Sequence, residues 1–357
     1  MNSGCKLILV STFRHFYMSI GLALNSPGIR FYLMFIDQVN DGPQNKVFTA
    51  AKAIGAPFFA VDCLPAKSAD QKKSEVRSLG FAQLREVLAE IKPNEIITGN
   101  DRRLEFQYAM HFCRSHLKLS VKGAFIDDGT GSYISFQNNK FLRKLSDKYI
   151  DTPLKKIAYG NWYRRPEVFG ASSWVDICYL AHPELIPSSI AHNQIIELKC
   201  DYYTSFEAKK YFERFSRLLD EVVFPDKAEA GVLFVLPHSS MINAMYGSTG
   251  KLKTILLKVA TTYPNSKVYF KYHPRELGDP LSLEEIGYPL TSAIPAELYY
   301  SVFDFDLIVG DVSTALMAAK WLMPEADVRY LPVQSIEGEL VARLFEKLSI
   351  KPLMIEA

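Results

Sequence analysis

The chain has 357 residues, which is long enough for two α/β domains with separate cores. Apolar residues make up 48% and charged residues 22%, as in an ordinary globular protein, and the net charge of +2 provides no field that would recruit nucleic acid. The five cysteines are scattered without metal-ligand spacing, which is typical of reduced thiols in a cytoplasm. Only Leu7–Val10 is apolar before Ser11, and no run approaches the roughly 20 apolar residues of a membrane span. We therefore expect a cytoplasmic protein without signal peptide that meets a membrane, if at all, peripherally.

Short apolar runs alternate with helical patterns, which indicates βαβ units and parallel sheets. Apolar residues at three- and four-residue spacing predict helices over Gln44–Ile54 and Lys72–Ile91. The expected strands of the first half are Leu7–Val10, Phe31–Ile36, Phe58–Val61, Glu95–Thr98 and Gly123–Ile126.

A second series of similar size follows Pro225. Its expected strands are Val232–Leu236, Lys267–Tyr272, Leu307–Val309 and Val328–Leu331, with helices at Lys251–Thr261, Thr314–Trp321 and Glu337–Leu348. A strand, Val175–Leu180, and an amphipathic helix, Phe206–Val222, lie between the series. The expected architecture is α/β, with two Rossmann-like, doubly wound domains, 1–170 and 226–357, that are joined by a connecting segment, 171–225, and face a central cleft.

Ligands of open parallel sheets bind beyond the carboxyl ends of the strands, so the residues there are candidates for a site. The strand Gly123–Ile126 runs into Asp127, Asp128 and Gly129. Adjacent carboxylates suit a general base because like charges raise one pKa, and the glycine lets a ligand approach. An ordinary polar turn uses the same residue types.

The strand Lys267–Tyr272 leads to His273 and Pro274. A histidine here can donate a proton to a leaving phosphate, or bind it when charged, and the proline fixes the backbone. A plain strand-to-turn dipeptide is the alternative, since His182 and Pro183 also follow a strand.

The strand Leu307–Val309 runs through Gly310 to Ser313 and Thr314 at a helix start. Hydroxyls, free N–H groups and the positive helix end favour a phosphate there, although such a residue is often only an N-cap. Glu297, in the first turn of another helix, could accept hydrogen bonds from ribose hydroxyls or simply stabilise its helix.

Polar residues at other strand ends are candidates for the acceptor side: Arg14 and His15 after the first strand, and Asn100 and Arg102, which could hold a carboxylate, after the fourth. The segment 140–165 carries eight lysines and arginines against two aspartates, interleaved with aromatic residues. This pattern predicts a surface for anionic lipid headgroups or an anionic glycan, or else a solvated helix with an apolar inner face.

The three strand-end motifs, acidic-acidic-Gly, His-Pro and Ser-Thr, occur in an order that resembles the bacterial GT-B sialyltransferases, namely the lipooligosaccharide sialyltransferases and capsule polysialyltransferases. The segment Thr98–Arg103 and the following Glu105–Gln107 also look like the polysialyltransferases. The resemblance covers about residues 95–320, and Thr314 departs from it by replacing a serine while keeping the hydroxyl.

The resemblance implies a GT-B fold and an inverting transfer of sialic acid (Neu5Ac) from CMP-sialic acid to a galactoside or sialoside terminus of a bacterial lipooligosaccharide, O-antigen or capsule glycan. Asp128, or secondarily Asp127, would be the base, and His273 the acid. The donor would be bound by Lys271, Pro274, Glu297, Gly310, Ser313 and Thr314, and the acceptor by Gly129, Asn100, Arg102, Arg14 and His15. The protein would work at the inner face of the inner membrane, with a glycan or glycolipid as partner.

A CMP donor has one phosphate, so no metal is needed to bridge a diphosphate, and we expect neither metal nor cofactor beyond the co-substrate. Another CMP-ulosonic acid (Kdo, legionaminic or pseudaminic acid) is an alternative donor. A GT-B sugar-nucleotide epimerase or hydrolase would need further charged residues around a diphosphate, which we do not find. A non-enzymatic scaffold subunit is a further alternative, against which the intact motifs argue.

Overall fold

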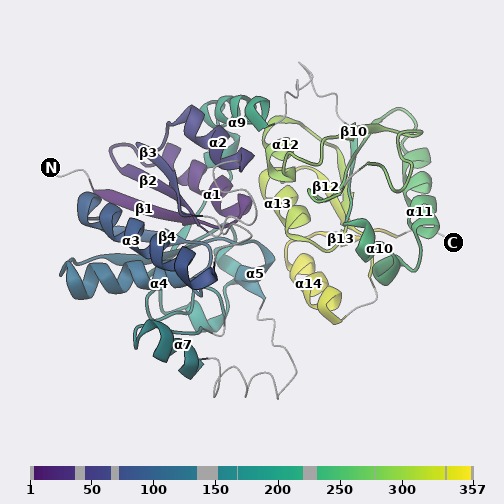
Figure 1. The fold of residues 1–357 in the computed structure, drawn as a ribbon. Coiled ribbons are helices and arrows are strands. Elements are labelled where there is room, and N and C mark those ends of the chain that lie inside the picture. The colour runs from purple at the N-terminus through teal and green to yellow at the C-terminus, as the bar shows by residue number, and fades with distance from the viewer. Residues whose placement is uncertain are drawn as a thin grey trace. The chain divides into compact units, whose positions relative to one another are not determined.

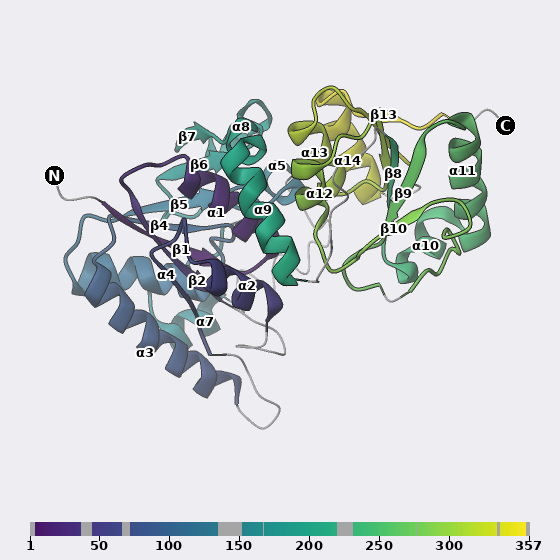
Figure 2. The ribbon, with the colours of Figure 1, turned by 90° about the horizontal axis from the view of Figure 1, so that it is seen from above.

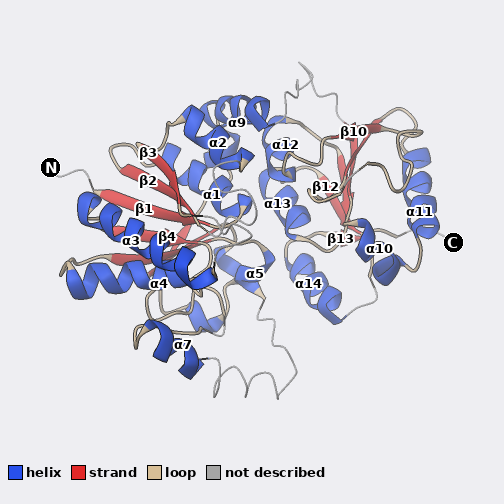
Figure 3. Cartoon of the chain, viewed as in Figure 1, coloured by secondary structure: helices blue, strands red, loops and turns tan. Residues whose placement is uncertain are grey.

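A computed structural model of the chain describes residues 4–36, 45–65, 72–134, 152–166, 168–219, 231–276, 278–333 and 336–354. The chain divides into two compact units, Met1–Tyr202 and Tyr203–Ala357. Each unit contains its own parallel sheet with helices on both faces (Figure 1, Figure 3).

Seven parallel strands form the first sheet in the order β3-β2-β1-β4-β5-β6-β7. Their bounds are Cys5–Val10 (β1), Arg30–Phe35 (β2), Ala60–Cys63 (β3), Glu95–Thr98 (β4), Lys122–Ile126 (β5), Ile177–Leu180 (β6) and Gln194–Glu197 (β7). The strand order reverses between β1 and β4, and open sheets of this type bind ligands beside that switch point. Residues that follow β1, β4 and β5 are therefore well placed for a site.

Two layers of helices cover this sheet (Figure 1, Figure 2). On one face lie α1 (Phe13–Leu24) and α2 (Lys46–Ile54), whose Phe16 and Phe48 rings contact Phe35 at 5.6 and 5.7 Å between centroids. On the other face, α3 (Lys73–Ile91) and α4 (Leu104–His111) share one apolar core with Leu7 and Leu9 of β1. The smaller helical elements of the unit are Phe112–His116, α5 (Thr130–Tyr133), α7 (Thr152–Tyr159), Pro183–Leu185 and Ser188–Ile190, and α8 (Asp201–Thr204) spans the boundary to the second unit.

The second sheet has the order β10-β9-β8-β11-β12-β13, which repeats the order of the first six strands of the first sheet. Its strands are Gly231–Val235 (β8), Lys267–Lys271 (β9), Tyr288–Leu290 (β10), Leu307–Gly310 (β11), Asp327–Tyr330 (β12) and Lys351–Pro352 (β13). Its helices are α9 (Phe206–Leu219), α10 (Ser239–Tyr246), α11 (Thr249–Thr262), α12 (Ala296–Val302), α13 (Thr314–Leu322) and α14 (Ile336–Lys347). Here the switch point lies between β8 and β11.

The elements expected from the sequence in the two series are present, most with ends within about two residues of the prediction. The segment 171–225 differs from the expected connector. Strand β6 pairs in parallel with β5, and β7 with β6, so these strands extend the first sheet, whereas α9 belongs to the second unit. Among the described helices, none has the length and apolar character needed to cross a bilayer.

Candidate functional site

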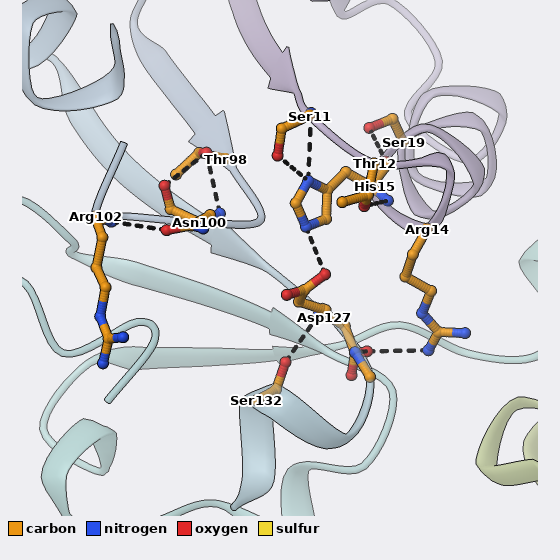
Figure 4. Close-up of polar contacts among 12 residues, drawn as sticks. Ser11, Thr12, Arg14, His15, Ser19, Thr98, Asn100, Arg102, Asp127 and Ser132 are labelled. Carbon is orange, nitrogen blue, oxygen red and sulfur yellow. Dashed lines mark hydrogen bonds and ion pairs between the residues drawn. The ribbon is translucent and has the colours of Figure 1, made fainter. Parts of the chain in front are cut away.

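The carboxyl ends of β1, β4 and β5 bring several polar side chains together in the first unit (Figure 4). Helix α1 begins directly after β1, and Thr12 is its N-cap, accepting a hydrogen bond from the His15 N–H at 3.3 Å. This tight connection places Arg14 and His15 in the first turn of α1, where both reach the loop that follows β5.

His15 and Asp128 form a close pair, with His15 Nε2 2.7 Å from Asp128 Oδ1. The histidine is 1% exposed, whereas the Asp128 side chain is 23% exposed. On the other side of the ring, Nδ1 lies 3.1 Å from the Ser11 hydroxyl and 3.5 Å from the Ser11 backbone nitrogen. A backbone N–H can only donate, so Nδ1 accepts and the ring proton is assigned to Nε2, which donates to Asp128.

Gly99, the first residue after β4, lies against the His15 ring. A Cβ atom at this position would be 2.0 Å from His15 Cδ2 and 2.1 Å from its Nε2, far inside van der Waals contact. The backbone of residue 99 therefore packs directly against the imidazole, and only glycine allows the two to come this close.

Asp127, the neighbour of Asp128, is fully buried and held on several sides. Arg14 Nη2 donates to its Oδ1 at 3.0 Å, the N–H groups of Gly129 and Ala181 donate at 2.7 and 3.2 Å, and the Tyr133 hydroxyl donates to Oδ2. Burial alone would raise the pKa of Asp127, but the Arg14 charge and these hydrogen bonds lower it overall. Asp127 is thus an ionised group with both oxygens in use.

The turn after Asp128 keeps space beside its second oxygen. The Asp128 N–H donates to Ser132 Oγ at 2.8 Å. Gly129 adopts a φ of 73°, in the left-handed region that favours glycine. A Cβ at Gly131 would lie 3.8 Å from Asp128 Oδ2. Within the described residues, Oδ2 takes part in no hydrogen bond.

Asn100 and Arg102, the expected carboxylate binders, order the turn after β4. The Arg102 N–H donates to Asn100 Oδ1 at 3.0 Å, and Arg102 Nε donates to the Pro166 carbonyl at 3.0 Å. The guanidinium also lies 4.7 Å from the centre of the Phe169 ring. These contacts account for both residues locally, and their role toward an acceptor stays a prediction.

In the second unit, two histidines face each other beyond β8 and β9. The rings of His238 and His273 are 5.9 Å apart at 85°, and His273 and Pro274 are exposed. The Arg275 N–H donates to His273 Nδ1 at 3.2 Å, so Nε2 carries the proton of the neutral ring. Partial burial and the nearby Arg275, His238 and Lys271 lower the pKa of His273, and Glu276 opposes the shift.

Lys271, the last residue of β9, is 2% exposed, and its ammonium donates to the carbonyls of Tyr272 and Ser292 at 3.1 and 3.5 Å. Burial lowers the pKa of Lys271 to about 8, and the Glu297 carboxylate opposes this shift. Glu297 is itself buried in the first turn of α12. Both side chains are therefore buried at this end of the sheet rather than exposed on the surface.

The Ser-Thr motif opens α13, with Ser313 as N-cap and Thr314 as first residue. The Ser313 side chain makes no capping hydrogen bond to the helix. Burial raises the pKa of Asp311 to about 6. Gly310 is required by packing, because a Cβ there would be 2.7 Å from the Val235 carbonyl oxygen and 2.8 Å from Leu316 Cδ1.

The structure therefore places the expected site residues in two sets, one at the strand ends of each unit. The first set holds Asp127, Asp128, Gly129, Arg14, His15, Asn100 and Arg102, and the second holds Lys271, His273, Pro274, Glu297, Gly310, Ser313 and Thr314. Sequence reasoning did not single out Ser11, Gly99 or Tyr133, which complete the first set. Of the basic segment 140–165, residues 140–151 lie outside the described residues, and 152–165 include α7.

The family model of the alpha-2,8-polysialyltransferases (POLYST) matches residues 81–331. The chain belongs to this family. The resemblance inferred from the three motifs is thereby confirmed, and the protein is a glycosyltransferase of the sialyltransferase type. Comparison with curated proteins finds no match.

Solved structures confirm the GT-B fold of this polysialyltransferase-family chain. The GT-B domain of a sialyltransferase from Photobacterium damselae aligns with a TM-score of 0.54 and 10% identity, covering 97% of each chain. A UDP-GlcNAc 2-epimerase from Methanocaldococcus jannaschii gives 0.53 and 14%, covering 98% of this chain and 88% of the epimerase. The glycotransferase of kitacinnamycin gives 0.54 and 12%, covering 99% and 86%.

Proposed function

We propose that this chain transfers sialic acid from CMP-sialic acid to a sialoside terminus of a bacterial surface glycan, with inversion at the anomeric carbon. The observation that carries the proposal is the Asp128 carboxylate, which stands at a strand end with one oxygen held by His15 and the other without a hydrogen bond among the described residues. The family description supports a sialoside as acceptor, with a galactoside as the alternative.

Asp128 acts as the base in this proposal. Its Oδ2 takes the proton of the acceptor hydroxyl while that oxygen bonds to the anomeric carbon, and the bond from this carbon to the CMP phosphate breaks. The proposed roles are those of the two carboxyl groups of inverting glycosidases, in which base and acid work on opposite faces of the sugar. Asp127 suits a supporting role instead, because its charge is balanced by Arg14 and both its oxygens are engaged.

The second unit supplies the donor site in this proposal. His273 Nε2–H faces the CMP phosphate, together with the hydroxyls of Ser313 and Thr314 and the N–H groups of the first turn of α13. The negative phosphate favours the protonated ring, so donor binding raises the lowered pKa of His273. The imidazolium can then pass a proton to the phosphate oxygen as CMP leaves.

Peripheral contact with anionic lipid is part of the same proposal. On α7, Leu154 and Ile157 are 58% and 83% exposed, and Lys155 and Lys156 lie between them in the sequence. Apolar side chains beside lysines on one short helix suit the boundary between headgroups and acyl chains.

The first test is an incubation of CMP-Neu5Ac with oligosialic acids and a panel of galactosides, read by mass spectrometry and CMP release. Acceptor-dependent release with a product larger by one or more sialic acids is the expected result. CMP release without acceptor would indicate a hydrolase, and transfer from another CMP-ulosonic acid alone would reassign the donor.

The second test replaces the base. Asp128→Asn should lower turnover on the order of a hundredfold or more while CMP affinity, measured by calorimetry, stays near that of the wild type. Asp304→Asn, at an exposed position in the second unit, is the matched control. Near-normal turnover of Asp128→Asn would place the base elsewhere.

A further inference from the structure

Two adjacent residues of α1 hold the two adjacent carboxylates after β5, and they do so with different chemistry. Arg14 donates to Asp127 and His15 donates to Asp128, at 3.0 and 2.7 Å. We infer that His15 is the positioning residue of the proposed base: it holds Oδ1 of Asp128 and thereby turns Oδ2 toward the acceptor hydroxyl. This inference rests on the proposed function and gives His15 a role other than the acceptor contact expected from the sequence.

The two carboxylates differ in the charge of the side chain that donates to them. A cation beside a carboxylate makes it a poorer proton acceptor, and the Arg14 guanidinium does this to Asp127. The His15 ring accepts from the Ser11 N–H at Nδ1, so a single ring proton, on Nε2, is enough to make both of its contacts. A ring with one proton orients Asp128 without placing a full positive charge against it, unlike the guanidinium beside Asp127.

Besides Asp128, two residues hold the His15 ring, as a positioning residue needs. Ser11 binds Nδ1 through its hydroxyl and its N–H, and the Gly99 backbone packs against the ring. The backbone of His15 is fixed as well, because its N–H donates to Thr12 and its carbonyl accepts from Ser19 Oγ at 2.6 Å. With 1% of its surface exposed, the ring has little freedom to turn away from Asp128.

A matched pair of substitutions separates the two sides of the ring. Nε2 of a glutamine can take the place of the His15 Nε2 and still donate to Asp128. The shorter asparagine can place its Oδ1 near the position of Nδ1, where it still accepts from the Ser11 N–H, but it does not reach Asp128. We expect His15→Gln to retain turnover within a few-fold, and His15→Asn to lose on the order of a hundredfold in kcat, as for a displaced catalytic group. The KM for CMP-Neu5Ac should stay the same in both.

Gly99→Ala tests the same position without changing the imidazole. The new Cβ would collide with the ring, so kcat should fall as in His15→Asn, whereas Gly250→Ala, with nothing within 4 Å of its Cβ, should be unchanged. The kcat of the double variant Gly99→Ala/His15→Asn should be no lower than that of the less active single variant, because both changes break the same contact between His15 and Asp128. CMP binding and thermal melting of every variant report whether the protein is folded.

Equal loss in the glutamine and asparagine variants, losses that add in the double variant, or a higher donor KM in place of a lower kcat would each overturn the positioning role. Full activity of His15→Asn with an inactive Asp128→Asn would refute this inference alone. An active Asp128→Asn, or a wild-type protein without acceptor-dependent CMP release, would instead refute the proposed function.

Discussion

The buried Arg14–Asp127 ion pair gives the sharpest prediction about stability. Asp127→Asn keeps the shape of the side chain but removes its charge, so the buried Arg14 guanidinium, 7% exposed, loses its ion pair with this carboxylate. Breaking a buried pair by removing one partner costs about 3–5 kcal/mol. A domain is stable by about 5–15 kcal/mol in total, so the first unit should lose a large part of its free energy of unfolding.

Urea unfolding followed by tryptophan fluorescence can assign this loss to the first unit. Trp162 and Trp174 lie in that unit and Trp321 lies in the second, so a Trp321→Phe background reports the first unit alone. Asp128→Asn, whose side chain is partly exposed, should shift the midpoint much less. The double variant Arg14→Met/Asp127→Asn should recover part of the loss, because both charges of the buried pair are then removed.

The difference in free energy of unfolding between the wild type and Asp127→Asn should depend on pH with a definite sign. Asp127 has a lowered pKa in the folded protein, so its contribution to stability is present above the unfolded value of about 3.9 and is lost as the pH falls below it. The gap between wild type and Asp127→Asn should therefore narrow in acid. An Asp127→Asn protein that unfolds like the wild type but has lost turnover would refute this reasoning and make Asp127 the base.

Three further outcomes are expected. Burial lowers the pKa of Lys271 to about 8, so above pH 8 the native protein has released a proton that the unfolded chain holds up to about pH 10. The free energy of unfolding of the wild type should therefore rise, relative to that of Lys271→Met, by about 1 kcal/mol per pH unit in this range. A difference between the two proteins that does not change with pH in urea titrations would contradict the burial argument. EDTA should leave sialyl transfer unchanged, and a loss restored by Mg²⁺ would show that the reaction needs a metal. Replacing Leu154 and Ile157 by serine should weaken flotation with anionic liposomes, whereas unchanged flotation would exclude α7 as the contact.

Much of the fold could be predicted because the strands are short apolar runs bounded by polar residues. Helix α1 was not predicted. Every residue from Arg14 to Ala23 is buried, so the polar residues of this helix do not mark a side that faces solvent. Thr12 as N-cap was the available signal. Strand β7 was missed because two of its four residues are exposed and none is fully buried.

The candidate site was predictable in its parts but not in its pairings. Asp127, Asp128 and His273 were identified because they follow strands, and that holds whatever the strand order is. The contact of His15 with Asp128 depends on the order, because β1 and β5 are not neighbours and β4 lies between them. Only the sheet topology reveals that His15 reaches across the end of β4. The missing side chain of Gly99 leaves the space that the His15 ring occupies there.

The contact between Gly99 and His15 also constrains how this family can diverge. Any side chain at position 99 would occupy the space of the imidazole, so relatives that keep a histidine at position 15 must keep a glycine at position 99. The reverse does not hold, since a small residue in place of His15 would leave room for alanine or serine beside it. Substitution at these two positions should therefore be one-directional, with the histidine lost before the glycine changes.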